Sequence, residues 1–313
     1  MTLDAASQAF LVSLAKAAGP DSTPIWRMSV AEARAATARF RGLYGAGPDV
    51  GEVTDVQIPA HDGGSFRVRI IVPTTRAGAI ILYLHGGGWM LEDLEGFDTL
   101  GRQLAQKSGA VVVLAEYRKA PEHPFPVPVE DAWTALRWTA AHAEELTFGG
   151  VPLFVAGDSA SGNLAAVVAR RSRDCGGPQL AGQILVYPLT DGDLSRPSYR
   201  EEENQTLLTT AAVAWFTAHY VPEPSDRTDP DFAPLLADSL AGLPPALIIT
   251  GEHDVLRDEG EAYAHRLRAD GVAVDHRRWP GQMHGFFTLV NVLPGGAEVM
   301  DLIAAKIHAG RVA

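Results

Sequence analysis

Gly157-Asp158-Ser159-Ala160-Ser161-Gly162 follows the apolar run 151–156 and precedes a helix-like run over 163–170, so Ser159 lies in a turn between a strand and a helix. Such a turn exposes a serine side chain at the end of a strand, where it can act as a nucleophile. The alternative is an ordinary turn or capping residue, because small polar residues are common at both places. The remaining sequence has to distinguish these two interpretations.

The turn departs from its usual pattern at one position. The pattern is Gly-x-Ser-x-Gly, because strand, turn and helix crowd the positions two residues either side of the serine. Gly157 fits this pattern, whereas Ser161 replaces the second glycine. A serine is small, and its hydroxyl could bond to nearby backbone or to water, so we expect an altered turn that still works. Ser161 itself is a poor nucleophile candidate, because Ser159 and Asn163 would then fill the crowded positions.

Strand-like and helix-like segments alternate on both sides of this turn. Apolar runs predict strands over 68–72, 80–84, 111–115, 153–156, 183–187, 246–250 and 273–278. Helix-like segments lie between them over 97–108, 127–143, 162–173 and 259–270. Most of the strand runs look buried on both faces, which is typical of a mainly parallel sheet with crossover helices. The sequence therefore predicts an α/β fold.

Two segments interrupt the alternation. Residues 1–45 carry apolar residues at helical spacing and a capping-box pattern from Ser29 to Glu32. Residues 191–230 contain a predicted helix that Thr209 or Thr210 would cap and that prolines from position 222 onward would stop. These segments could form a lid over a site or an ordinary peripheral layer.

A nucleophilic serine needs a histidine to take its proton and a carboxylate to orient that histidine. Asp254 and His284 each lie in a loop directly after a predicted strand. The chain order serine, acid, histidine is that of α/β-hydrolases. Glu252 and Asp258 are rival acids, and Asp254 could instead cap the helix that follows it. Its position after the strand favours Asp254.

A second motif, His85-Gly86-Gly87-Gly88-Trp89, directly follows the predicted strand 80–84. Consecutive glycines let the backbone approach a substrate and direct amide groups at one point, as an oxyanion site requires. The amide after the nucleophile, that of Ala160, would supply a further donor. The alternatives are a flexible turn or a phosphate loop. The motifs of phosphate loops and dinucleotide sites are missing from the sequence, which favours the oxyanion interpretation.

Five segments together resemble the bacterial hormone-sensitive-lipase-like (family IV) carboxylesterases of the α/β-hydrolase superfamily. They are His85-Gly86-Gly87-Gly88, Glu116-Tyr117-Arg118-Lys119-Ala120-Pro121-Glu122-His123-Pro124-Phe125-Pro126, Gly157-Asp158-Ser159-Ala160, Asp254-Val255-Leu256-Arg257-Asp258-Glu259-Gly260 and His284-Gly285-Phe286. The resemblance covers nearly the whole chain. It implies a hydrolase core over 46–190 and 231–313, with a helical cap built from residues 1–45 and the insertion 191–230.

The resemblance also implies a role for each motif residue. Ser159 would be the nucleophile, Asp254 the acid and His284 the base. The other implied site residues are the oxyanion amides of Gly87, Gly88 and Ala160, the loop-supporting residues His85 and Gly86, and the elbow residues Gly157, Asp158 and Ser161. Glu116 and Lys119 stand where the family usually has aspartate and leucine, and we expect neither to touch the site.

The predicted reaction is hydrolysis of small carboxylic esters, of short to medium chain length, through an acyl-enzyme. No metal or organic cofactor is expected, because the sequence contains no histidine and cysteine cluster at ligand spacing. Amidases, lactonases and acyltransferases use the same residues, and a non-enzymatic binding module could use the same fold.

Composition limits the partners. The formal net charge of −12 is spread along the chain, which argues against nucleic acid or anionic lipid. No apolar run approaches the ~20 residues that span a bilayer, and the N-terminus lacks a basic signal-like region. A single cysteine, Cys175, fits a reducing compartment. We therefore expect a cytoplasmic protein that acts on a small ester and that could form a homodimer.

Overall fold

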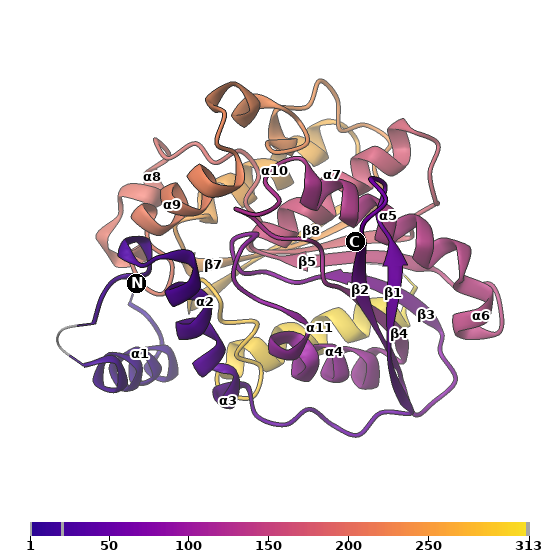
Figure 1. The fold of residues 1–313 in the computed structure, drawn as a ribbon, viewed down its shortest axis with the longest axis horizontal. Helices are drawn as coiled ribbons and strands as arrows, with labels where there is room; N and C mark the ends of the chain where they lie inside the picture. Colours follow the sequence, from indigo (N-terminus) through magenta and orange to yellow (C-terminus); the bar gives the residue numbers. More distant parts are fainter. Residues whose placement is uncertain (1, 20–21, 311–313) are drawn as a thin grey trace.

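An eight-stranded, mainly parallel sheet organises the computed structural model, which describes residues 2–19 and 22–310 (Figure 1). The strand order is β1-β2-β4-β3-β5-β6-β7-β8. β2 pairs antiparallel with β1 and β4, and the remaining neighbours pair parallel. The strands are β1 (Glu52–Pro59), β2 (Ser65–Val72), β3 (Ala79–Leu84), β4 (Ala110–Ala115), β5 (Leu153–Asp158), β6 (Gly182–Val186), β7 (Ala246–His253) and β8 (Val274–Met283).

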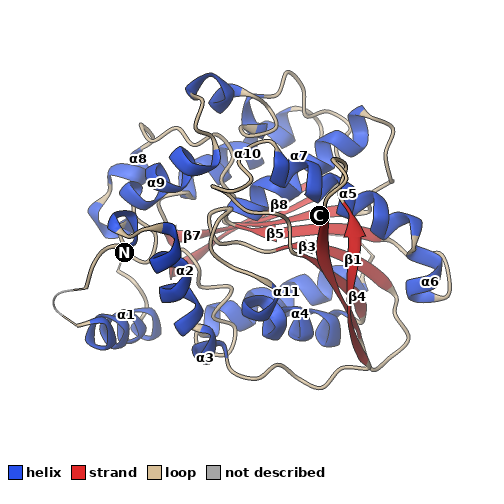
Figure 2. Cartoon of the chain, in the orientation of Figure 1, coloured by secondary structure: helices blue, strands red, loops and turns tan. Residues whose placement is uncertain are grey.

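Helices cover both faces of this sheet (Figure 2). α4 and α11 lie on one face, and α5, α7 and α10 lie on the other (Figure 1). No helix in the described part of the chain is long and apolar enough to cross a membrane. The helices are α1 (Ala5–Ala18), α2 (Val30–Arg39), α3 (Arg41–Tyr44), α4 (Leu94–Ser108), α5 (Val127–Ala141), α6 (Ala143–Thr147), α7 (Ala160–Asp174), α8 (Pro197–Arg200), α9 (Thr210–Tyr220), α10 (Arg257–Ala269) and α11 (Pro294–His308).

The apolar strands are buried on both faces because helices pack against each side. In β3, Ile80 and Leu82 belong to the hydrophobic cluster under α5, α7 and α10. Ile81 and Tyr83 of the same strand belong to the cluster under α4 and α11. Alternate side chains of a strand point to opposite faces, so one apolar run fills both cores.

The α/β fold is confirmed, and each predicted apolar run lies within or overlaps a strand. Strand β1 was missed because most of its side chains are exposed or half-buried, which leaves no apolar run. Helix α11 was also missed. The predicted helix over 127–143 is in fact two helices, since α5 ends at Ala141 and α6 begins at Ala143.

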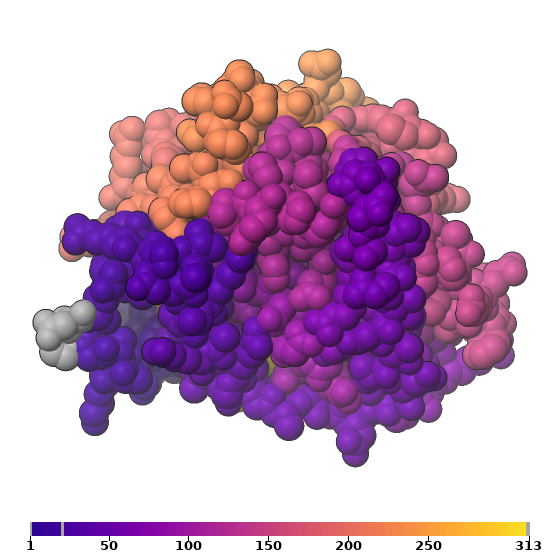
Figure 3. Space-filling model, in the orientation of Figure 1, coloured from indigo at the N-terminus to yellow at the C-terminus, as the bar shows by residue number. Residues whose placement is uncertain are grey.

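The two segments outside the alternation are helical, and they lie on the same side of the molecule (Figure 1). The predicted capping box is confirmed at α2, where Ser29 accepts from the Glu32 amide and Glu32 accepts from the Ser29 amide. Thr209 caps α9 by accepting from the Ala212 amide. The N-terminal residues Ile25–Arg27 contact α9, and Figure 3 shows indigo N-terminal atoms directly beside orange ones. Both segments therefore meet over one end of the sheet.

Candidate active site

Ser159 lies between the end of β5 and the start of α7, in a backbone conformation that non-glycine residues rarely adopt. Its φ is +57°, in the left-handed region. The Ser159 amide donates to the Val186 carbonyl at 2.9 Å, which fixes the turn to the neighbouring strand. A conformation of this kind is typical of a serine held out at a strand-to-helix turn.

The turn explains why one flanking position is glycine and the other accepts serine. A Cβ atom on Gly157 would lie 2.2 Å from the Ser161 carbonyl oxygen, so a side chain does not fit there. The fully buried Ser161 side chain instead points to a polar group and donates to the His85 carbonyl. The Tyr117 hydroxyl donates to the same carbonyl at 2.8 Å and lies 3.0 Å from Ser161 Oγ. The crowded position therefore accommodates a hydroxymethyl group.

The structure brings Ser159, His284 and Asp254 together in one hydrogen-bonded chain. His284 Nδ1 lies 2.8 Å from Asp254 Oδ2, and His284 Nε2 lies 2.9 Å from Ser159 Oγ. A proton on Nδ1 faces the carboxylate, so Nε2 is free to accept the serine proton. Asp254 is fully buried and its other oxygen accepts from the Leu256 amide at 2.9 Å. This geometry suits proton transfer from the serine.

The two rival acids have other partners. Glu252 accepts from the Gly281 amide at 2.8 Å. Asp258 accepts from the Ser198 amide at 2.8 Å and pairs with Arg257 at 3.0 Å. Asp254 is therefore the acid that the fold brings to His284.

Asp158 fixes the start of the glycine loop beside the serine. One oxygen of its buried carboxyl group accepts from the Gly86 amide at 3.0 Å and from the Tyr83 hydroxyl at 2.8 Å. Burial raises the pKa of Asp158 to about 6, and these hydrogen bonds oppose the rise. A Cβ atom on Gly86 would lie 2.3 Å from the other Asp158 oxygen. Gly86 therefore shapes the loop, and its amide is already engaged.

Gly87 and Gly88 both have positive φ, +109° and +62°. A Cβ atom on Gly88 would lie 2.3 Å from the Phe216 ring, and one on Gly87 would lie 2.9 Å from Glu92. Within residues 2–19 and 22–310, neither amide donates to a protein acceptor. The Ala160 amide begins α7, where helix amides lack intrahelical partners. These amides are available to bind an oxyanion.

His85 supports the loop as a neutral ring. Its ring stacks on Tyr117 at 4.7 Å, and its Nδ1 donates to the Gly86 carbonyl at 2.9 Å. Burial lowers the pKa of His85 to about 3, so the ring carries no charge at neutral pH.

A cavity of about 250 Å³ opens at Ser159 and His284. Its walls are mainly apolar and come from both the N-terminal segment and the insertion. The apolar side chains from these segments are Phe10, Leu14, Ile25, Phe40, Leu43, Leu207, Leu208, Ala212 and Phe216. Sequence reasoning missed the cavity-lining Glu92 and Tyr44. Glu92 lies only a few residues after Gly88, and this proximity to the glycine loop was a signal that could have identified it.

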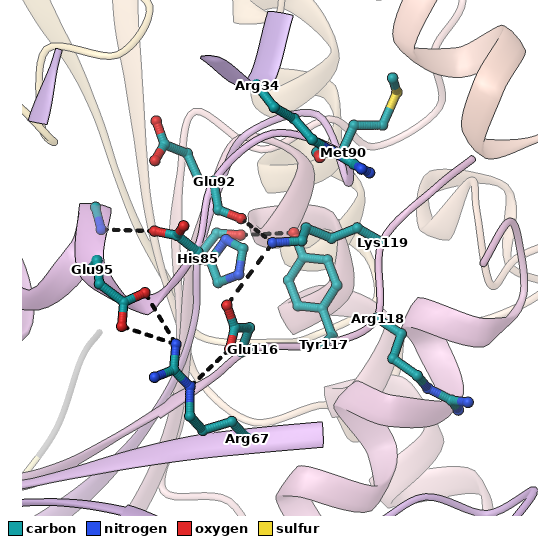
Figure 4. Close-up of polar contacts among 12 residues, drawn as sticks. Arg34, Arg67, His85, Met90, Glu92, Glu95, Glu116, Tyr117, Arg118 and Lys119 are labelled. Atoms are coloured by element: carbon teal, nitrogen blue, oxygen red, sulfur yellow. Dashed lines mark hydrogen bonds and ion pairs between the residues drawn. The ribbon is translucent and has the colours of Figure 1, made fainter. Parts of the chain in front are cut away.

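An acidic group lies near this cavity. Carboxylate oxygens of Asp93, Glu95 and Glu116 come within 4.8 Å of one another, a spacing that could suit a metal ion. Arginine side chains already pair with all three. Arg41 pairs with Asp93. Arg67 pairs with Glu95 and with Glu116, at 2.9 Å each (Figure 4). We assign no metal to this group.

Comparisons with known proteins agree with this geometry. A family model described as the alpha/beta hydrolase fold matches residues 81–288. The chain is 46% identical to carboxylesterase NlhH of Mycobacterium tuberculosis over 225 residues, which cover 70% of each chain. It is 34% identical to an ethyl acetate hydrolase of Pseudomonas putida over 313 residues, or 97% of this chain and 98% of that one.

Solved structures extend the similarity to the whole fold. A hyperthermophilic esterase from Pyrobaculum calidifontis superposes with a TM-score of 0.90 at 38% identity, covering 100% of both chains. An ester hydrolase from the metagenome of Lake Arreo superposes with a TM-score of 0.92 at 36% identity, covering 98% of this chain and 99% of that one. The similarity thus includes the N-terminal helices and the insertion as well as the sheet.

Proposed function

The chain belongs to the α/β-hydrolase fold family as a hormone-sensitive-lipase-like carboxylesterase, and we propose that Ser159, His284 and Asp254 are its nucleophile, base and acid. The observation that carries this assignment is the continuous hydrogen-bonded chain from Ser159 Oγ through His284 to the buried Asp254. The positive φ of the half-buried Ser159, in the turn between β5 and α7, supports it further.

In the proposed first step, His284 Nε2 takes the Ser159 proton while Oγ attacks the ester carbonyl carbon. The amides of Gly87, Gly88 and Ala160 hold the negative charge that develops on the carbonyl oxygen. The bond to the alcohol oxygen then breaks, and His284 gives its proton to the leaving alcohol. Ser159 is left acylated.

In the second step, water gives a proton to His284 and attacks the acyl-enzyme carbonyl. The same amides stabilise the second oxyanion, and the bond to Ser159 Oγ breaks as His284 returns the proton. Asp254 accepts a hydrogen bond from Nδ1 throughout and stabilises the imidazolium.

We further propose that residues 1–45 and 191–230 form a cap on a core made of 46–190 and 231–313. Apolar side chains of both segments line the cavity at Ser159. Arg34 ties the N-terminal segment to the core, because it donates to the Met90 and Ala120 carbonyls at 2.9 Å and forms a bidentate pair with Glu122. The cap would shield the bound ester from bulk solvent during the first step.

The proposed substrates are small esters with short to medium acyl chains. The modest volume and apolar walls of the cavity support this class. The relative from Pseudomonas putida, an ethyl acetate hydrolase, acts on an ester of this size. A cytoplasmic location and a homodimer stay predictions from the sequence.

The test compares Ser159→Ala with Ser65→Ala, which removes an exposed hydroxyl at the start of β2. Hydrolysis of 4-nitrophenyl acetate and butanoate should fall by about 10⁴-fold or more in Ser159→Ala only. A reactive alkyl phosphonate should add covalently to the wild type, and the adduct should map to Ser159 by mass spectrometry. Wild-type turnover by Ser159→Ala would refute the assignment.

A further inference from the structure

Glu92 places a carboxyl group in the wall of the catalytic cavity. It shares this cavity with Ser159 and His284, although most of the other lining side chains are apolar. Only 7% of Glu92 is exposed. Acidic side chains are rarely buried to this degree without a partner.

The Glu92 carboxyl group has little hydrogen bonding within the chain. Its Oε2 atom is buried and has no hydrogen-bond partner among the described residues. Its Oε1 atom accepts one long contact, 3.5 Å, from the hydroxyl of Tyr44, which lines the same cavity. The nearby Arg41 pairs with Asp93 instead. A buried polar group of this kind calls for a partner that the protein alone does not supply.

The surrounding chain holds the carboxyl group in place. The Lys119 ammonium donates to the Glu92 backbone carbonyl at 2.6 Å, so Lys119 lies closer to the site than the sequence suggested. Figure 4 shows the Glu92 carboxyl pointing away from Lys119 and Glu116. A Cβ atom on Gly96 would lie 2.3 Å from Glu92 Oε2, so this glycine leaves the space that the carboxyl fills. The carboxyl group is therefore positioned by its neighbours.

We propose that Glu92 is a specificity-determining residue that accepts a hydrogen bond from a hydroxyl group on the substrate, so that the enzyme selects hydroxylated esters. The inference rests on the proposed function, because it assumes that esters bind in the cavity at Ser159. A hydroxyl is favoured over an ammonium group, since bringing a cation into an apolar cavity costs far more desolvation. The Tyr44 hydroxyl offers the same substituent a second polar contact.

Ionisation of Glu92 strengthens this selection. Burial raises the pKa of Glu92 to about 7, Asp93 and Asp158 add to the rise, and Arg41 and the Tyr44 hydroxyl oppose it. A carboxylate accepts a stronger hydrogen bond than a protonated carboxyl group. An unsubstituted alkyl chain binds less favourably beside the carboxylate than beside the protonated carboxyl group, because the charge loses its solvation without gaining a partner. The preference for a hydroxylated ester should therefore grow as the pH rises through about 7.

The test measures kcat/KM for ethyl hexanoate and for ethyl hexanoates that carry a hydroxyl at C3, C5 or C6. The informative quantity is the ratio of kcat/KM for the hydroxylated ester to kcat/KM for the unsubstituted ester, because any pH effect on the acyl-transfer steps themselves is common to both substrates. Wild type, Glu92→Gln and Glu92→Leu are compared. Glu95→Gln is the matched control, since this exposed carboxylate pairs with Arg67 and does not line the cavity.

For at least one hydroxyl position, the wild-type ratio should exceed that of Glu92→Leu by about tenfold, with Glu92→Gln between them and Glu95→Gln like the wild type. The wild-type ratio should rise between pH 6 and 8, and that of Glu92→Gln should stay flat. Equal ratios in the wild type and both Glu92 variants at every position would overturn the proposal. A Glu92-dependent preference for amino-substituted hexanoates alone would overturn the choice of a hydroxyl.

These outcomes are separable from a failure of the proposed function. Hydrolysis that continues in Ser159→Ala would refute the nucleophile. An unchanged ratio in an enzyme that still requires Ser159 would refute only the role of Glu92. Glu92→Gln has the shape of the native side chain, so the pH profile remains measurable if Glu92→Leu does not fold.

Discussion

The Ser161 hydroxyl donates a hydrogen bond to the backbone carbonyl of His85, which links helix α7, directly after Ser159, to the first residue of the glycine loop. The Tyr117 hydroxyl donates to the same oxygen. The serine that replaces the usual glycine therefore adds a contact between the turn that carries the proposed nucleophile and the loop that carries the proposed oxyanion amides. Ser161 does not line the cavity, so we expect this contact to position the loop and not to touch the substrate.

Ser161→Ala tests this link. It removes the hydroxyl and keeps the helix-favouring side chain, whereas Ser161→Gly would also loosen α7. We expect the free energy of unfolding to fall by about 1 kcal/mol, because the His85 carbonyl keeps Tyr117 as a donor. We also expect kcat to fall a few-fold with KM nearly unchanged. Denaturant unfolding and steady-state kinetics measure both.

Tyr117→Phe and the double variant complete a double-mutant cycle with Ser161→Ala. Both hydroxyls donate to one carbonyl oxygen, so the effects of the two substitutions should be non-additive. The double variant should lose more stability and more kcat than the two single variants together. Wild-type stability and kcat in Ser161→Ala would show that the hydroxyl does not position the loop.

Asp254→Asn tests the acid. The amide keeps the shape of the side chain, but it cannot stabilise the imidazolium and favours the wrong tautomer of His284, so kcat should fall by about 10⁴-fold. Glu252→Gln and Asp258→Asn are matched controls at the rival acids and should stay within a few-fold of the wild type. If kcat instead fell by this much in one of the two controls while Asp254→Asn stayed active, the residue changed in that control would be the acid.

Gly88→Ala tests the contact between the glycine loop and the proposed cap. The new methyl group would meet the Phe216 ring of α9, and alanine disfavours the positive φ at this position. We expect kcat/KM to fall by about 10²-fold, the typical effect of losing one oxyanion donor.

Combining Gly88→Ala with Phe216→Ala separates the two causes. Removing the ring relieves the clash but not the backbone strain, so activity should recover in part. Phe216→Ala alone supplies the reference for the double variant. If the double variant is no more active than Gly88→Ala, the ring does not press on the loop in solution.

The sequence was informative wherever a role depends on chain order. Asp254 and His284 were predicted because each follows an apolar strand, and parallel strands bring their carboxyl ends to one edge of a sheet. Glu92 was not predicted as a cavity residue, because its contact with Tyr44, which is distant in the sequence, forms only in the folded chain. Strand β1 was missed for a related reason, since it is stabilised by pairing with β2 and not by an apolar pattern of its own.

Glu92→Gln should also change the pH dependence of stability. The carboxyl pKa is about 7 in the folded chain against an ordinary 4.5, so the folded state binds more protons than the unfolded state between these pH values. Stability of the wild type is therefore lost as the pH rises from about 4.5 to about 7. Glutamine does not titrate. The pKa shift therefore corresponds to a change of at most about 3 kcal/mol in the free energy of unfolding of the wild type relative to Glu92→Gln. Denaturant unfolding of both proteins from pH 4 to 8 should show Glu92→Gln gaining stability over the wild type with rising pH. Subtracting one curve from the other removes the contribution of Asp158 and the other titrating groups that both proteins share. Parallel curves would mean that the Glu92 carboxyl keeps an ordinary pKa in the folded chain.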